Sequence, residues 1–174
     1  MKNIVLTGFM GSGKSSVGKM VAKELNYTFY DMDTVICERT GKSVQHIFDQ
    51  FGEEYFRDLE SEVAKDLAKT KLSVIACGGG TVLRPSNIDT LRENGIIFFL
   101  DTPIHVIEDR MVLLAGRPLL VGTTPIQLRK IFDSRKEFYA NNDFSIHTEN
   151  KKISSVAVEI AEIYKAQVGI PVQK

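Results

Sequence analysis

Eight residues near the amino terminus constrain this chain more than any other segment: Gly8-Phe9-Met10-Gly11-Ser12-Gly13-Lys14-Ser15. They fit the P-loop pattern in full, with an apolar strand expected at residues 4–7 and helical spacing of Val17, Val21 and Leu25 afterwards. Glycines let the backbone curl so that successive N–H groups face a phosphate, and the following helix points its positive end at the same anion. The segment therefore predicts a nucleotide-binding α/β protein.

Each residue type in this segment has a chemical role. Lys14 can reach the outer phosphates of a nucleotide, and the Ser15 hydroxyl can be a ligand for magnesium. We expect the nucleotide to be bound by consecutive residues of the loop and the helix start: Gly11, Ser12, Gly13, Lys14, Ser15 and Ser16. The alternative is a glycine-rich turn that only joins a strand to a helix, but all eight positions and both flanking elements favour the phosphate site.

Composition excludes several classes of protein. The chain has 174 residues with 43% hydrophobic content, and its 22 basic side chains balance its 22 acidic ones, so no global positive field attracts nucleic acid. No apolar run approaches the roughly 20 residues that a membrane span requires. Cys37 and Cys77 are too few for a disulfide framework, and the start of the sequence lacks a signal-peptide pattern. We expect a cytoplasmic protein with reduced thiols.

Short apolar runs alternate with longer helical patterns, which is typical of a parallel sheet flanked by helices. We expect strands at residues 4–7, 28–30, 72–76, 96–100 and 144–147, and helices from residue 15 and at 55–69, 127–141 and 154–165. The second strand leads to Asp31, and the third stops at Gly78-Gly79-Gly80. In open parallel sheets, ligands bind beyond the carboxyl ends of the strands, so both stops are candidate binding segments.

Two carboxylates close the second strand, in the segment Asp31-Met32-Asp33. Residues two apart on a strand face the same side, so Asp31 and Asp33 are expected to point the same way. Paired carboxylates beside a phosphate loop can hold magnesium and receive a hydroxyl group. A helix N-cap ahead of Thr34 is an alternative reading, and the two roles are compatible.

The remaining candidates are the triple glycine and three arginines. Each glycine weakens local structure by roughly 0.5–1 kcal/mol, which favours close approach of a ligand to the backbone over a simple turn. Arg57, Arg117 and Arg135 lie in separate segments. An exposed arginine is usually only solvated, but guanidinium groups that converge on one cleft form a bidentate carboxylate site.

Taken together, these residues resemble the shikimate kinase family. The ordered motifs cover nearly the whole chain: GFMGSGKS at Gly8–Ser15, YDMD at Tyr30–Asp33, FRDLE at Phe56–Glu60, CGGG at Cys77–Gly80 and RPLL at Arg117–Leu120. The resemblance implies an α/β fold with a five-stranded parallel sheet in the order 2-3-1-4-5, flanked by helices. It also implies a single P-loop kinase domain at 1–174, with a substrate-binding insert at about 33–60 and a lid at about 112–124.

The resemblance also implies the reaction, which is transfer of the γ-phosphoryl group of ATP to the 3-hydroxyl of shikimate in aromatic amino acid biosynthesis. It implies a monomer that uses Mg²⁺, held by Ser15 and Asp31. Arg110 and the lid residue Arg117 would join the P-loop in binding ATP. The residues expected to bind shikimate are Asp33, Arg57, Gly78, Gly79, Gly80 and Arg135. The residues expected to act in catalysis are Lys14, Asp33 and Arg117.

Two other functions share part of this pattern. Another P-loop metabolite kinase, such as a gluconate kinase, would keep Gly8–Ser15 but need a polyol site in place of the arginines. A nucleotide-dependent switch protein would bind ATP without a small acceptor and would not need Asp33 or the triple glycine. The motifs favour shikimate over both alternatives.

Overall fold

The computed structural model describes residues 1–113 and 124–170. Five parallel strands form one sheet in the order β2-β3-β1-β4-β5, which confirms the predicted fold class. Arg117 and most of the expected lid, residues 114–123, lie outside the described residues. The strands are β1 (Asn3–Thr7), β2 (Thr28–Asp31), β3 (Ser73–Ala76), β4 (Gly95–Asp101) and β5 (Phe144–His147).

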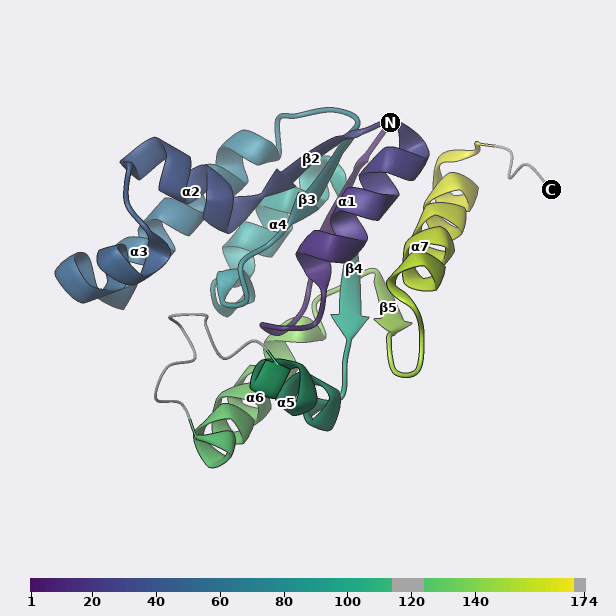
Figure 1. Cartoon of the computed structure of the whole chain (residues 1–174). Helices are drawn as coiled ribbons and strands as arrows, with labels where there is room; N and C mark the ends of the chain where they lie inside the picture. Colours follow the sequence, from purple (N-terminus) through teal and green to yellow (C-terminus); the bar gives the residue numbers. More distant parts are fainter. Residues whose placement is uncertain (114–123, 171–174) are drawn as a thin grey trace.

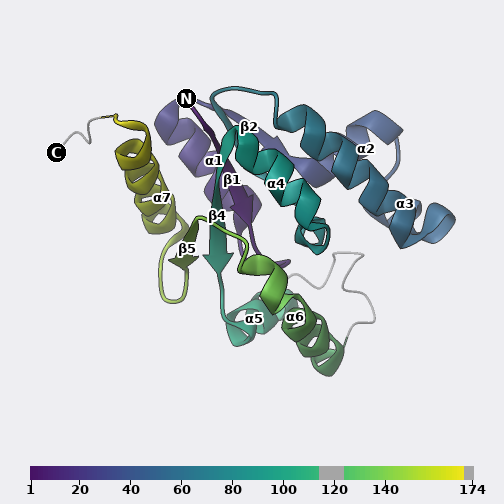
Figure 2. The ribbon, with the colours of Figure 1, turned by 180° about the vertical axis from the view of Figure 1, so that it is seen from behind.

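Helices connect the strands and lie on both faces of the sheet (Figures 1 and 2). In Figure 1, α1 and α7 lie on the near face, and α4 lies behind the sheet. Helices α2 and α3 extend beyond β2 at one side, while α5 and α6 lie near the carboxyl end of β4. The helices are α1 (Lys14–Leu25), α2 (Met32–Thr40), α3 (Val44–Leu67), the 3₁₀ turn η1 (Thr81–Leu83), α4 (Pro85–Glu93), α5 (Ile104–Leu113), α6 (Pro125–Tyr139) and α7 (Ile153–Val168).

Alternation along the central strand divides the core into two layers. Ile4 and Leu6 of β1 pack into the cluster that α1 and α7 share, while Val5 points into the cluster of α3 and α4. All three side chains are fully buried, as expected for a strand covered on both faces. The register aligns Leu6 of β1 with Ala76 of β3 and Phe98 of β4, so the three carboxyl ends reach one edge together.

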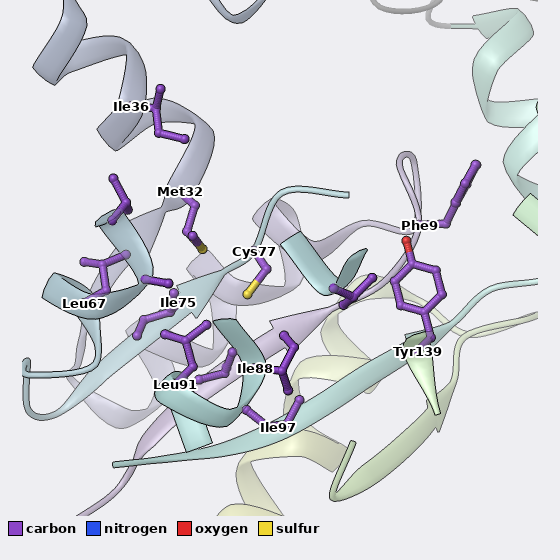
Figure 3. Close-up of a cluster of buried hydrophobic side chains, with 14 of the residues drawn as sticks. Phe9, Met32, Ile36, Leu67, Ile75, Cys77, Ile88, Leu91, Ile97 and Tyr139 are labelled. Atoms are coloured by element: carbon purple, nitrogen blue, oxygen red, sulfur yellow. The ribbon is translucent and has the colours of Figure 1, made fainter. Parts of the chain in front are cut away.

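The cluster on the α3 and α4 face supports the segments that leave this edge (Figure 3). Met32 at the start of α2, Cys77 just after β3 and Ile88 of α4 are buried side chains of this cluster. Their packing holds the ends of β2 and β3 against the helices. The polar segments that follow these strands therefore start from a rigid base.

The predicted boundaries differ most from the structure in two places. The helix expected at 55–69 begins at Val44, and it bends at Gly52, where φ is 83° and the backbone is non-helical. The second strand ends at Asp31, and α2 begins at Met32, so Asp33 lies on a helix.

No helix among residues 1–113 and 124–170 is both long and apolar enough to cross a membrane.

Candidate active site

A cavity of about 870 Å³ lies at the carboxyl edge of the sheet. The P-loop, the start of α2, the helix α3 and the last two residues of the triple glycine all contribute to its wall. Two predicted residues are absent from this wall: Gly78 is buried behind it, and Arg117 lies outside the described residues. The predicted residues that line the cavity are Gly11, Ser12, Gly13, Lys14, Ser15, Ser16, Asp31, Asp33, Arg57, Gly79, Gly80, Arg110 and Arg135.

The P-loop has the backbone of an anion site. Gly11 and Gly13 have φ values of 77° and 99°, in the left-handed region that favours glycine. Helix α1 begins at Lys14 without a side-chain N-cap, so its first N–H groups are available to a ligand. The buried Ser12 hydroxyl has no hydrogen-bond partner in the described part of the chain, so it too is available to a ligand. These donors suit a phosphate group.

Two cations lie against this loop. The Lys14 ammonium donates to the carbonyl oxygens of Gly8, at 2.8 Å, and Phe9, at 3.0 Å. Burial lowers the pKa of Lys14, and the nearby Asp33 carboxylate opposes that shift. Arg110 of α5 donates from Nη1 to the Gly11 carbonyl at 2.9 Å. Both side chains are therefore fixed beside the loop, where a bound phosphate would lie.

The two aspartates lie in different environments. Asp31 is the N-cap of α2: its Oδ1 accepts from the Thr34 amide at 3.3 Å, and its Oδ2 accepts from the Ser15 hydroxyl at 2.5 Å. Asp33 is in the first turn of α2, so the expectation that both carboxylates project from one strand was wrong. The turn of the helix nevertheless brings both side chains to the cavity.

Asp33 has an altered proton affinity. Burial, followed by the negative charges of Asp31 and Glu60, raises the pKa of Asp33 to about 6, and Lys14 and Arg57 oppose the rise. A carboxylate with this pKa is still charged at neutral pH and accepts a proton more readily than an ordinary aspartate. The position therefore suits a group that receives a proton.

Arg57 is held by carboxylates and aromatic rings of α3. Its Nη1 donates to Glu60, and its Nη2 donates to Glu53 at 2.8 Å. Burial opposes the charge of Arg57, but Glu60 and Glu53 outweigh burial and raise its pKa. The guanidinium carbon lies 5.9 Å from the ring centre of Phe48 and 5.6 Å from that of Phe56. Glu60 is three residues and Glu53 four residues from Arg57 along α3, which is the spacing at which helical side chains meet.

The triple glycine lies among these side chains. None of the three glycines has a positive φ, so glycine is needed here for space. A Cβ at Gly80 would lie 2.5 Å from Cζ of Arg57, and one at Gly78 would lie 2.8 Å from Oδ1 of Asp33. Side chains at these positions would displace Arg57 and Asp33.

Arg135 reaches the same glycines from α6. Its Nη1 donates to the Gly79 carbonyl at 3.3 Å, and the hydroxyl of Tyr139 donates to that carbonyl at 2.7 Å. The guanidinium of Arg135 lies 5.7 Å from the ring centre of Phe9. The structure therefore brings Arg57 and Arg135, distant in sequence, to adjoining glycines of one cavity.

Comparison with known proteins identifies the family. A sequence model described as shikimate kinase matches residues 10–165. This chain belongs to the shikimate kinase family. The shikimate kinase of Thermodesulfovibrio yellowstonii is 44% identical over 166 residues, covering 95% of this chain and 96% of the relative. That of Caldanaerobacter subterraneus is also 44% identical, over 165 residues covering 94% of this chain and 96% of the relative.

Solved structures agree with this assignment. A shikimate kinase from Acinetobacter baumannii, in complex with shikimate, is 32% identical with a TM-score of 0.89, covering 96% of this chain and 94% of that one. A gluconokinase from Sinorhizobium meliloti is 19% identical with a TM-score of 0.62, covering 97% of this chain and 95% of that one. The second likeness shows only a shared fold. The chain is thus a kinase of the shikimate kinase family, as its motifs predicted.

Proposed function

We propose that this chain transfers the γ-phosphoryl group of ATP to the 3-hydroxyl of shikimate, releasing ADP and shikimate 3-phosphate. The observation that carries the proposal is a single cavity lined by both the P-loop and the Asp33, Arg57 and Arg135 side chains. A phosphate donor and a small anionic acceptor can therefore meet in one cavity. The relatives named shikimate kinase and the Acinetobacter complex with shikimate support the choice of acceptor.

ATP would bind with its phosphates in the P-loop. The amides around Gly11 and Gly13 and the first turn of α1 supply donors for the β-phosphate. Lys14 is fixed by the Gly8 and Phe9 carbonyls, so its ammonium can stabilise charge on the transferred group without first being ordered. Arg110, which is bound to the Gly11 carbonyl, would contact the same nucleotide.

Ser15 and Asp31 fit a magnesium site. Their side-chain oxygens are 2.5 Å apart beside the P-loop, and magnesium prefers oxygen ligands. The described residues contain no cluster of three or more His, Cys, Asp or Glu side chains that could hold a metal. Kinase magnesium sites commonly use one or two protein ligands together with phosphate and water, so this small set is sufficient. When bound with ATP, magnesium neutralises phosphate charge.

Shikimate would bind at the other end of the cavity. Arg57 and Arg135 would hold its carboxylate beside Gly79 and Gly80, and Asp33 would accept a hydrogen bond from its 3-hydroxyl. Phosphoryl transfer has a loose transition state, so in-line placement of that oxygen matters more than a strong base. Asp33 would take the hydroxyl proton late in the transfer. We assign this acceptor-binding role to residues 33–60 and the glycines within one kinase domain.

Acceptor preference tests this proposal. ADP release should be measured with ATP and magnesium against shikimate, quinate, gluconate and nucleoside monophosphates. We expect turnover with shikimate to exceed turnover with each other acceptor. Nucleoside monophosphates lack the carboxylate for Arg57 and Arg135, and quinate and gluconate hold their carboxylate and hydroxyl groups in a different arrangement from shikimate. A preference for gluconate would favour the metabolite-kinase alternative, and ADP release that no acceptor increases would favour a nucleotide switch.

Substitution of the two arginines tests the carboxylate clamp. Lysine keeps the charge but loses the planar pair of donors, so Arg57→Lys and Arg135→Lys should each raise KM for shikimate about tenfold. KM for ATP should change little. Arg84→Lys is a matched control, because Arg84 pairs with Glu54 and Asp58 on the surface of α3 and does not line the cavity. If KM for ATP rose instead, Arg57 and Arg135 would belong to the ATP site, which would contradict their assignment to the shikimate site.

A further inference from the structure

The Thr81 hydroxyl makes a contact that the assigned roles do not explain. Thr81 begins η1, directly after the triple glycine, and is completely buried. Its Oγ1 donates to Oε1 of Glu60 at 2.6 Å. Its amide donates to the Gly78 carbonyl at 3.2 Å, so its backbone is tied to the same glycine stretch. The CGGG motif ends at Gly80, one residue before Thr81, and the proposed mechanism does not use Thr81.

Glu60 connects this hydroxyl to Arg57. The Glu60 side chain is completely buried, and a buried carboxylate needs a partner on each oxygen. Thr81 occupies Oε1, and Nη1 of Arg57 donates to Oε2. A carboxylate held at both oxygens has a fixed plane, so the position of Nη1 is fixed as well. Gly78 provides the space, because a Cβ there would lie 2.5 Å from Oε1 of Glu60 and 3.2 Å from Oγ1 of Thr81.

Arg57 also has a competing partner. Glu53, one turn earlier on α3, accepts from Nη2 at 2.8 Å and from Nε at 3.3 Å, and its side chain is 59% exposed. An exposed partner on a flexible side chain contributes little to orientation. The buried Glu60 carboxylate therefore decides where the guanidinium points, and Thr81 decides where Glu60 lies.

We propose that Thr81 is a positioning residue for the substrate carboxylate, acting through Glu60 on Arg57. This inference rests on the proposed function, because it requires Arg57 to bind shikimate. Loss of the hydroxyl leaves Oε1 of Glu60 buried without a donor. The carboxylate then turns toward its remaining partner, and Arg57 loses its fixed position beside Gly80.

Thr81→Val is the direct test, because valine keeps the shape and removes the hydroxyl. We expect KM for shikimate to rise about tenfold, the scale of one lost hydrogen bond to a charged group, with KM for ATP unchanged. Thr81→Ser, which keeps the hydroxyl, should restore KM to within about twofold of the unmodified protein. Thr70→Val is the control: its hydroxyl donates to the Leu67 carbonyl at 2.7 Å, ahead of β3 and remote from the cavity. If Thr81→Val does not fold, Thr81→Ala replaces it.

A double variant shows whether the effect passes through Arg57. In the Arg57→Lys background, adding Thr81→Val should raise KM for shikimate far less than in the unmodified protein. Three outcomes would each overturn the inference. The Thr81→Val protein could fold and keep a normal KM for shikimate, or its KM values for shikimate and ATP could rise equally. The effects of Thr81→Val and Arg57→Lys could also be fully additive. The unmodified protein is assayed in parallel, because absence of shikimate-dependent ADP release there would refute the proposed function itself.

Discussion

Lys14→Ala should abolish turnover while the protein still folds. The ammonium stabilises charge on the transferred phosphoryl group, and its loss costs about 3–5 kcal/mol of transition-state stabilisation, a rate loss on the order of 10²–10³ or more. Stability should not fall, because Lys14 is a buried amine whose pKa is lowered by desolvation. Its removal deletes a buried charge from the unliganded protein. Initial rates of ADP release and thermal melting of the same samples check both expectations.

Lys23→Ala is the matched control for this experiment. Lys23 lies at the exposed, opposite end of α1, so its substitution removes a lysine from the same helix without touching the cavity. It should leave the rate unchanged. Near-normal turnover in a folded Lys14→Ala protein would contradict the assigned role of the P-loop lysine.

Asp33→Asn should lower kcat by about 10²–10⁴, the range of general base contributions, while magnesium–ATP binding persists. Asparagine keeps the size and one acceptor oxygen but cannot take the proton of the shikimate hydroxyl. Asp31→Asn should instead shift the magnesium dependence of the rate, because Asp31 is bound to Ser15 beside the P-loop. Titrations of the rate with magnesium and direct ATP-binding measurements separate the two results.

Asp66→Asn serves as the control for both substitutions. Its carboxylate pairs with Arg39 and Lys69 on the surface, far along α3 from the cavity, so the kinetics should be unchanged. Retention of most activity by Asp33→Asn would refute its role as proton acceptor. Loss of ATP binding with shikimate binding intact would instead mean that the functions of Asp31 and Asp33 are exchanged.

Local patterns made the fold predictable. The P-loop is contiguous, and the strand at 144–147 agrees in its bounds with β5, because apolar runs and glycine stops are properties of neighbouring residues. The first half of α3 was missed because Gly52 interrupts the helical spacing. Asp33 was placed on a strand because sequence alone did not reveal that the chain turns into α2 at Met32. The strand order was expected from the family resemblance.

Sequence was less informative about contacts across the cavity. The Arg57–Glu60 pair follows helical spacing, so it was predictable. Thr81 lies 21 residues from Glu60, and Tyr139 lies 60 residues from the Gly79 carbonyl that it binds, so no periodicity links either pair. A clue to Thr81 was its position directly after the triple glycine. Its partner could be found only in the folded structure.

The position of Cys77 gives this protein a built-in reporter of local opening. The Cys77 thiol is buried in the core cluster next to the triple glycine, and burial raises its pKa, so this structure protects it from alkylating reagents. The rate at which a reagent labels Cys77 therefore measures how often the segment around the triple glycine opens locally and exposes the thiol. Cys37 is only partly buried, so it should be labelled faster than Cys77. The ratio of the two labelling rates then reports how rarely the Cys77 thiol becomes exposed.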